Sequence, residues 1–246
     1  MTSNPDLQET KVSPTLERIN VPSAPQAAAE ALRNGIIRGD FKPGERLIEQ
    51  KVARLLGIGQ PTLREAFKEL EFQGFVRKGP KRGTYVTKLT NKDFRMIQEV
   101  RMALEALAIE KAALQLTLQA ELELREFVRS MGAAAEAFDL ESFHRMHMDF
   151  HRKVWALAGN VYLANALELV AFRLFAFVLI QRRESGSEFL NAAQQHQDIL
   201  AGLLSGDPVK AREAFVVSNL KSWGEHHQGK LDEKLLRVYS SAPNTT

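Results

Sequence analysis

Two histidines one helical turn apart have the side-chain chemistry and spacing of metal ligands. His147 and His151 stand at positions i and i+4 in a stretch with helical periodicity, so they share one face of the expected helix. Imidazole nitrogens placed in this way bind zinc or another divalent transition ion such as nickel. In the plainer alternative the two residues only line a cavity and are hydrogen-bonded without a metal. Asp149 is only two residues from His151 and should face another side of the helix.

A second group of residues has the chemistry of DNA recognition. The run GIGQP, with two glycines and a proline, precedes a helical stretch whose first polar residues are Gln60, Thr62 and Arg64. Arginine forms two hydrogen bonds with guanine, glutamine pairs with adenine, and threonine contacts a phosphate or a thymine methyl group. In the alternative interpretation, the turn only connects two helices and Arg64 pairs with Glu65 or Glu69.

The elements around these residues predict a small DNA-binding unit. The run AAAEALRNGIIR predicts a first helix, residues 47–56 a second and residues 60–73 a third, each followed by a glycine or a glycine turn. The run FVRKGPKRGTYVTKL alternates apolar and polar residues around a turn and predicts a two-stranded hairpin. Lys81 and Arg82 at the tip of this hairpin suit contacts with phosphates or the minor groove.

The rest of the chain has several long helical periods and no convincing strand. This pattern predicts an all-helical bundle, which would carry His147 and His151. The expected helices span residues 93–116, 118–137, 140–158, 162–183, 188–205 and 208–235.

Composition and charge divide the chain in the same way. Residues 1–90 contain 15 Lys and Arg against 10 Asp and Glu, and the remainder contains 18 against 20. The positive N-terminal part is therefore where a polyanion such as DNA should bind. The absence of cysteine excludes disulfides, thiolate zinc sites and cysteine nucleophiles, and it fits a reducing cytoplasm.

We expect five segments in order. Residues 1–24 form a disordered leader without the features of a secretory signal, residues 25–88 the DNA-binding domain and residues 89–93 a linker. Residues 94–236 form the helical domain, and residues 237–246 a disordered tail. The run VYLANALELVAFRLFAFVLI is the most apolar one, but Asn165, Glu168 and Arg173 interrupt it. A membrane span needs about 20 nearly uncharged residues, so we expect a buried helix and no membrane contact.

The N-terminal run GIIRGDFKPGERLIEQKVARLLGIGQPTLREAFKELEFQGFVRKGPKRGTYV resembles the winged helix-turn-helix domain of the GntR family of bacterial transcription regulators. The resemblance implies that Thr62 and Arg64 contact DNA and that Gly83 lets the wing approach the minor groove. Gln60 stands where arginine is usual, and Gln50 stands where one subgroup has another arginine. The preferred operator bases should therefore differ from those of arginine-rich relatives.

The C-terminal part resembles the all-helical effector-binding FCD domain of the FadR-like branch of that family. The runs that carry the resemblance are VRMALEALAIEKAA, FHRKVWALAGNVYL and HQDILAGLLSGDPVKAREAF. In such domains an aspartate and three histidines often hold a metal, and His151 and His196 match two of these positions. His147 stands in the place of the aspartate, and Ser218 stands at or beside the place of the last histidine. The resemblance thus implies a site of His147, His151 and His196.

Two arginines are candidates for binding an effector. Arg101 aligns with an arginine that binds an effector carboxylate in some relatives, and its alternative role is a helical ion pair with Glu105. Arg173 lies in the most apolar helix, where a charge needs a ligand or a partner such as Glu168. The aromatic residues of that helix cover nearly all its faces, which indicates burial on both sides or a dimer interface.

These observations predict a mostly α protein and a ligand-responsive regulator that is no enzyme. We expect a cytoplasmic homodimer that binds double-stranded operator DNA and acts as a repressor released by a small organic acid. An alternative is a metal-dependent hydrolase that uses His147, His151 and His196, although no general base is evident beside them. A further alternative is a dimeric scaffold that binds DNA without any effector.

Overall fold

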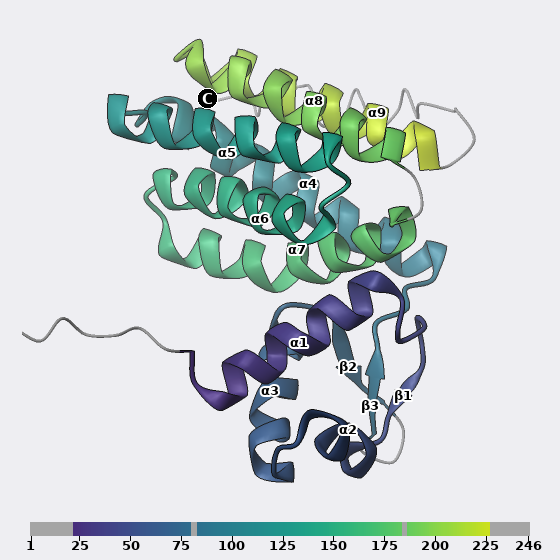
Figure 1. Cartoon of the computed structure of the whole chain (residues 1–246). Helices are drawn as coiled ribbons and strands as arrows, with labels where there is room; N and C mark the ends of the chain where they lie inside the picture. Colours follow the sequence, from purple (N-terminus) through teal and green to yellow (C-terminus); the bar gives the residue numbers. More distant parts are fainter. Residues whose placement is uncertain (1–21, 80–82, 184–185, 227–246) are drawn as a thin grey trace, which may run out of the picture.

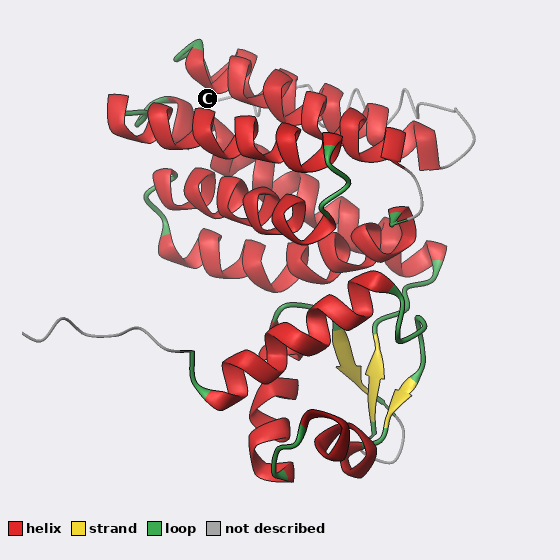
Figure 2. Ribbon diagram, in the orientation of Figure 1, coloured by secondary structure: helices red, strands yellow, loops and turns green. Residues whose placement is uncertain are grey.

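The chain folds into a small N-terminal domain on which a helical bundle is stacked (Figure 1). The computed structural model describes residues 22–79, 83–183 and 186–226. The expected tail, most of the expected leader and the wing-tip residues Lys81 and Arg82 lie outside these ranges. Within them the chain is mostly helical with a small sheet (Figure 2), which confirms the predicted fold class.

The N-terminal domain contains three helices, namely α1 (Ala24–Arg38), α2 (Glu49–Leu56) and α3 (Gln60–Phe72). Helix α1 begins with a capping box of Ser23 and Gln26. Helix α2 ends at Gly57, whose φ of 65° is left-handed, as the sequence predicts for this C-cap. Helix α3 has its proline in the first turn and buries Leu63, Ala66, Phe67 and Leu70.

A three-stranded antiparallel sheet completes this domain. The predicted hairpin is present as β2 (Val76–Lys78) and β3 (Thr84–Val86), with Val76 opposite Val86. A third strand, β1 (Arg46–Leu47), pairs with the other edge of β3. The expectation that Leu47 begins the second helix is wrong, because this residue belongs to strand β1. Its side chain still points into the core, and this burial accounts for its apparent helical periodicity.

The helical domain consists of α4 (Asn91–Ala113), α5 (Leu118–Glu136), α6 (Leu140–Leu157), α7 (Val161–Arg182), α8 (Gly186–Leu204) and α9 (Pro208–His226). Helix α4 begins earlier than expected because Thr90 and Asp93 form a capping box. Residues 91–93, expected in a linker, are thus its first turn. Helix α9 is described as far as His226, and the expected continuation to residue 235 lies beyond that point.

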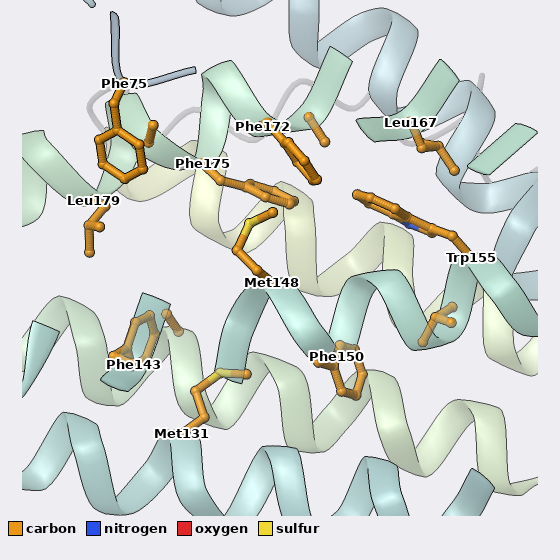
Figure 3. Packing of buried hydrophobic residues seen from close by; sticks show 14 of the residues in the cluster. Phe75, Met131, Phe143, Met148, Phe150, Trp155, Leu167, Phe172, Phe175 and Leu179 are labelled. Atoms are coloured by element: carbon orange, nitrogen blue, oxygen red, sulfur yellow. The ribbon is translucent and has the colours of Figure 1, made fainter. Parts of the chain in front are cut away.

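Helices α6 and α7 lie between the N-terminal domain and the other helices of the bundle (Figure 1). Their aromatic side chains, including Phe143, Phe150, Trp155, Phe172 and Phe175, form much of the core (Figure 3). By length and composition alone α7 could cross a membrane, but half of its most apolar window is buried inside the protein. A core helix has the same length and composition, and the side chains of α7 do contribute to the hydrophobic core.

Candidate functional site

A cavity of about 90 Å³ lies inside the helical domain. Helices α4, α6, α7, α8 and α9 all contribute to its wall. The polar residues of the wall are Gln98, Arg101, His144, His147, His151, Gln195, His196, Ser218 and Asn219, and the remainder is mainly aromatic and aliphatic. The cavity therefore combines an apolar lining with a few convergent polar groups, as ligand sites commonly do.

The three histidines predicted as metal ligands come together in this wall. Their ring nitrogens can all lie within 4.8 Å of one another. Helix α6 supplies His147 and His151 one turn apart, and α8 supplies His196 from the other side. The ring centroids of His147 lie 4.7 Å from those of His151 and 4.8 Å from those of His196.

Hydrogen bonds orient two of these rings. Nδ1 of His151 lies 2.5 Å from Oε1 of Glu105, and Nδ1 of His196 lies 2.7 Å from the carbonyl oxygen of Ala192. Carboxylate and carbonyl oxygens only accept hydrogen bonds, so each Nδ1 carries the proton. The Nε2 atoms of the two rings then face each other. Outer partners of this kind orient histidines that bind metals.

The two Nε2 atoms lie only 3.2 Å apart. This separation suits a cation held between the two nitrogens, either a proton in a hydrogen bond or a metal ion. A proton is disfavoured on His196, because burial and the neighbouring charge of His151 lower its pKa to about 3. Burial also lowers the pKa of His147 well below its usual value, so this ring is neutral as well. A donor set of three imidazole nitrogens fits a divalent transition ion.

Arg101 reaches the same cavity from α4. Its Nε donates to Oε2 of Glu105 at 2.6 Å, and both side chains are buried. Its guanidinium also lies 4.7 Å above the ring of Phe175 and donates to Gln98 at 3.3 Å. The helical ion pair considered from the sequence is therefore present. It does not remove Arg101 from the cavity wall.

Glu105 is the central residue that sequence reasoning did not assign to the site. It accepts hydrogen bonds from Arg101, from His151 and, at 3.1 Å, from Nε1 of Trp155. Burial alone would raise the pKa of Glu105, but the charges of Arg101 and His151 and the hydrogen bonds outweigh it and lower this pKa to about 2. Glu105 therefore stays ionised and connects the arginine to the histidine cluster.

Ser218, which stands at or beside the place of a family histidine, lines the cavity and is buried. Its hydroxyl can donate or accept a hydrogen bond but is a weak metal ligand. Asp149 lines a separate cavity between the two domains and not this one, as its spacing from His151 predicts. Among the described residues the cluster thus consists of three histidines, and Ser218 of α9 lines the same cavity.

Arg173 does not belong to the site. It is exposed on α7 and does not line the cavity. The residues that α7 contributes to the cavity wall are Leu174, Phe175, Val178 and Leu179. The expectation that this charge is buried is therefore wrong, because the uncovered face of α7 carries it to solvent. Its suggested partner Glu168 instead accepts from Arg152 at 3.0 Å.

The predicted DNA-contacting residues lie at the start of α3 and on α2. Gln50, Gln60 and Arg64 are exposed, and Thr62 is partly exposed. Arg64 pairs with Glu49 of α2 at 2.8 Å, and not with Glu65 or Glu69. The arginine side chain remains 58% exposed, and an exposed pair contributes at most about 1 kcal/mol, so DNA can replace the carboxylate.

Gly83 stands at the base of the wing. A Cβ atom there would lie 2.8 Å from Cε2 of Tyr85 and 3.1 Å from Nε of Arg46, so a side chain would push these groups apart. Packing against the side chains of β1 and β3 therefore favours glycine here, independently of any contact between the wing and DNA. The backbone N–H of Gly79 donates to the carbonyl of Gly83 at 2.9 Å and closes the hairpin.

Comparisons with known proteins agree with this architecture. Residues 25–86 match the family described as bacterial regulatory proteins, gntR family, and residues 96–217 match the FCD domain. A probable D-xylose utilization operon transcriptional repressor from Paenarthrobacter nicotinovorans is 31% identical over 180 residues, which cover 73% of this chain and 78% of that protein. The HTH-type transcriptional repressor GlaR from Escherichia coli (strain K12) is 27% identical over 190 residues, or 74% of this chain and 86% of that protein.

Solved structures show the same fold. The structure described as E. coli McbR/YncC aligns with a TM-score of 0.69 and 22% identity, and the alignment covers 85% of this chain and 99% of that one. A GntR regulator from Rhodococcus sp. RHA1 aligns with a TM-score of 0.63. These domains and relatives are those of transcription regulators and not of enzymes, which sets the hydrolase alternative aside. The chain belongs to the GntR family of bacterial transcription regulators and carries an FCD domain.

Proposed function

We propose that this protein is a cytoplasmic homodimeric repressor that leaves its operator when a small carboxylic acid binds in the FCD domain. The observation that carries the proposal is the buried cavity, in which Arg101 lies beside three convergent imidazoles. Two of its relatives are named as transcriptional repressors, which supports the direction of regulation. Linkage supplies the mechanism, since a ligand changes operator affinity by its difference in affinity for the two arrangements of the domains.

The charges in the cavity indicate that acid and metal bind together. Glu105 already neutralises Arg101, and the lowered pKa values of His147 and His196 keep these two rings neutral. A carboxylate that entered the cavity alone would be a buried charge without sufficient compensation, which is costly. A divalent ion held by His147, His151 and His196 would supply the missing positive charge and an open position for the acid. No chemical conversion of the acid is needed.

A ligand screen tests this dependence. Thermal unfolding is measured with a panel of small mono- and dicarboxylic acids, in the presence of Zn²⁺ and in the presence of a chelator. We expect an acid at 100 times its dissociation constant to add about 2.7 kcal/mol to the free energy of unfolding, and only with the metal present. Acids that stabilise equally in chelator would contradict the joint site, and a full screen without any stabilising acid would favour the effector-free scaffold.

The metal ligands are tested by elemental analysis and zinc titration of the purified protein. His151→Ala removes one of the two Nε2 atoms that face each other, so zinc affinity should fall by about tenfold or more. Asp149→Asn is the matched control, because it removes a nearby carboxylate that lines another cavity. Equal metal content in wild type and His151→Ala would refute the site.

DNA recognition is tested at Arg64. A duplex selected by the wild-type protein from a random library provides the operator probe. Arg64→Ala should lose about 1–3 kcal/mol of binding free energy at fixed salt and relax the base preference at its contact. Lys68→Ala is the control on the same helix, since Lys68 lies one turn after Arg64 and is exposed, but pairs with Glu65. An Arg64 variant with wild-type affinity and selectivity would overturn its role.

The dimer is proposed from two exposed apolar rows on neighbouring helices. Helix α4 exposes Met96, Val100 and Leu107, and α7 exposes Tyr162 and Leu169. The spacings of four and seven residues place each set on one face of its helix. Since α4 and α7 also pack on each other, a second copy of the chain could cover both rows at once.

A further inference from the structure

The C-terminal end of the recognition helix α3 is pressed directly against the helical domain. Gly74, which follows it, has a φ of 82°, and a Cβ atom there would lie 2.5 Å from Cα of Arg173 in α7. The ring of Phe72 meets the ring of Phe172 edge-on, with centroids 5.5 Å apart. The ring of Phe75 meets the ring of His144 in the same way at 5.3 Å. A side chain on Gly74 therefore has no space against α7, and a cavity lined by Gln73, His144 and Phe172 lies beside this contact.

Phe75 is hydrogen-bonded both to the recognition helix α3 and to the segment that follows strand β3. It is fully buried, and its N–H donates to the carbonyl of Leu70 in α3 at 2.9 Å. Its own carbonyl accepts from the N–H of Thr87, just after β3, at 2.9 Å. The hydroxyl of Thr87 also donates to the carbonyl of Gly74. A displacement of Phe75 therefore moves the recognition helix and the wing together.

The other partners of these two ring contacts, His144 and Phe172, lead back to the cavity: His144 directly and Phe172 through its neighbours. His144 lines the cavity and lies one turn before His147 on α6. The ring of Phe172 is nearly parallel to that of Trp155, with centroids 6.2 Å apart. Trp155 donates to Glu105, which holds His151 and Arg101. Two packed routes thus lead from the histidine cluster to the end of α3.

We propose that His144 is a positioning residue, whose ring transmits the state of the histidine cluster to the recognition helix through Phe75. The proposal rests on the metal site of the proposed function. When a ligand draws His147 and His151 toward His196, the rigid helix α6 must shift His144 with them. The ring of His144 is in edge contact with the buried ring of Phe75, so the shift is passed on to Phe75. The contact between Phe172 and Phe72 couples α7 to the same displacement of the end of α3.

Hydrogen exchange of the full-length protein, measured with and without Zn²⁺, tests the transmission and requires no knowledge of the operator. In the wild type, zinc should slow amide exchange in residues 147–151 and 192–196. It should also change the exchange of Phe75 and of strands β2 and β3 by about fivefold, the low end of usual coupling factors. His144→Ala should keep the first response and lose the second.

A ring-retaining variant separates coupling from a general loss of packing. His144→Phe keeps an edge against Phe75, so the response of residues 75–86 to zinc should return. If His144→Ala responds like the wild type, or if zinc protects the histidine segments of the wild type but leaves residues 75–86 unchanged, the proposed transmission is wrong while the metal site stands. If zinc protects neither segment in the wild type, the metal site itself fails and the inference falls with it.

Discussion

At the scale of single residues, the cavity depends on Glu105. Its carboxylate compensates the buried charge of Arg101 and orients His151 at the same time. Both tasks need an ionised group with two acceptor oxygens, which no neutral side chain of this size supplies. The residue therefore links the stability of the helical domain to its ability to bind a ligand.

Replacement of this carboxylate should cost more than loss of an ordinary helical ion pair. Glu105→Gln leaves Arg101 as a buried charge without a counterion, so we expect the free energy of unfolding to fall by about 3–5 kcal/mol. Glu121→Gln removes the acid of an exposed pair with Arg125 at the same helical spacing, and should cost at most about 1 kcal/mol. Urea unfolding of both variants measures the difference. Equal losses would show that the buried pair has no special weight.

The pH dependence of stability follows from the same carboxylate. The pKa of Glu105 lies at about 2 in the folded protein, below the ordinary value of 4.5. A lowered pKa in the fold means that the stabilisation is complete above about pH 4.5 and is lost as the pH falls toward 2. Unfolding curves between pH 5 and pH 3 should therefore decline more steeply for the wild type than for Glu105→Gln. Parallel declines would contradict the assignment.

Part of the site could be predicted from residue spacing. His147 and His151 share a helix face by spacing alone, and the structure places them together. Glu105 could not be assigned to the cluster, because its contact with His151 depends on how α4 packs on α6. Arg173 was placed wrongly since the surrounding apolar residues suggested burial, whereas one face of α7 is left uncovered in the monomer.

At the scale of elements, the turn after α3 connects the two domains. Gly74 is needed there both for its positive φ and for its contact with the backbone of α7. The turn before α3 also contains a glycine with positive φ, Gly57, but a side chain there would meet nothing within 4 Å. Substitution of Gly57 therefore tests the cost of the left-handed backbone alone, whereas substitution of Gly74 tests that cost together with the contact between the domains.

Alanine substitution of the two glycines should give different results. Gly57→Ala should lower the free energy of unfolding by about 1–2 kcal/mol, because alanine is strained in the left-handed conformation. Gly74→Ala adds a clash with backbone atoms that cannot rotate away, so we expect a greater loss of stability and faster protease cleavage after residue 86. Calorimetry and limited proteolysis compare the two variants. If Gly74→Ala is no worse than Gly57→Ala, the domains are not in the close contact described here.

Elements with strong local signals were predictable, and those defined by long-range pairing were not. The glycine caps and the turn GPKRG located α2, α3 and the hairpin because they act within a few residues. Strand β1 has only two residues and exists through its pairing with β3, far along the chain. The start of α4 is an exception, because the capping box of Thr90 and Asp93 is a local signal and yet lies in the expected linker.

At the scale of the whole molecule, the apolar rows on α4 and α7 predict that the repressor is a dimer. Leu169→Arg places a charge in the centre of the proposed contact and should shift the protein to a monomer in analytical ultracentrifugation. Leu122→Arg, which changes a similarly exposed leucine on α5, should leave the mass unchanged. A wild-type protein that is monomeric at micromolar concentration would refute the dimer.

The account as a whole requires that the FCD cavity controls sequence-specific DNA binding. The most direct measurement is the dissociation constant for a duplex selected from a random library, with a scrambled duplex as reference, at fixed salt with and without Zn²⁺ and a stabilising carboxylic acid. We predict that the wild type prefers the selected duplex by about 10³-fold or more, and that zinc with the acid weakens this binding by about fivefold or more while His151→Ala does not respond. Equal affinity for the two duplexes, or an affinity that the ligands leave unchanged in the wild type, would contradict the account.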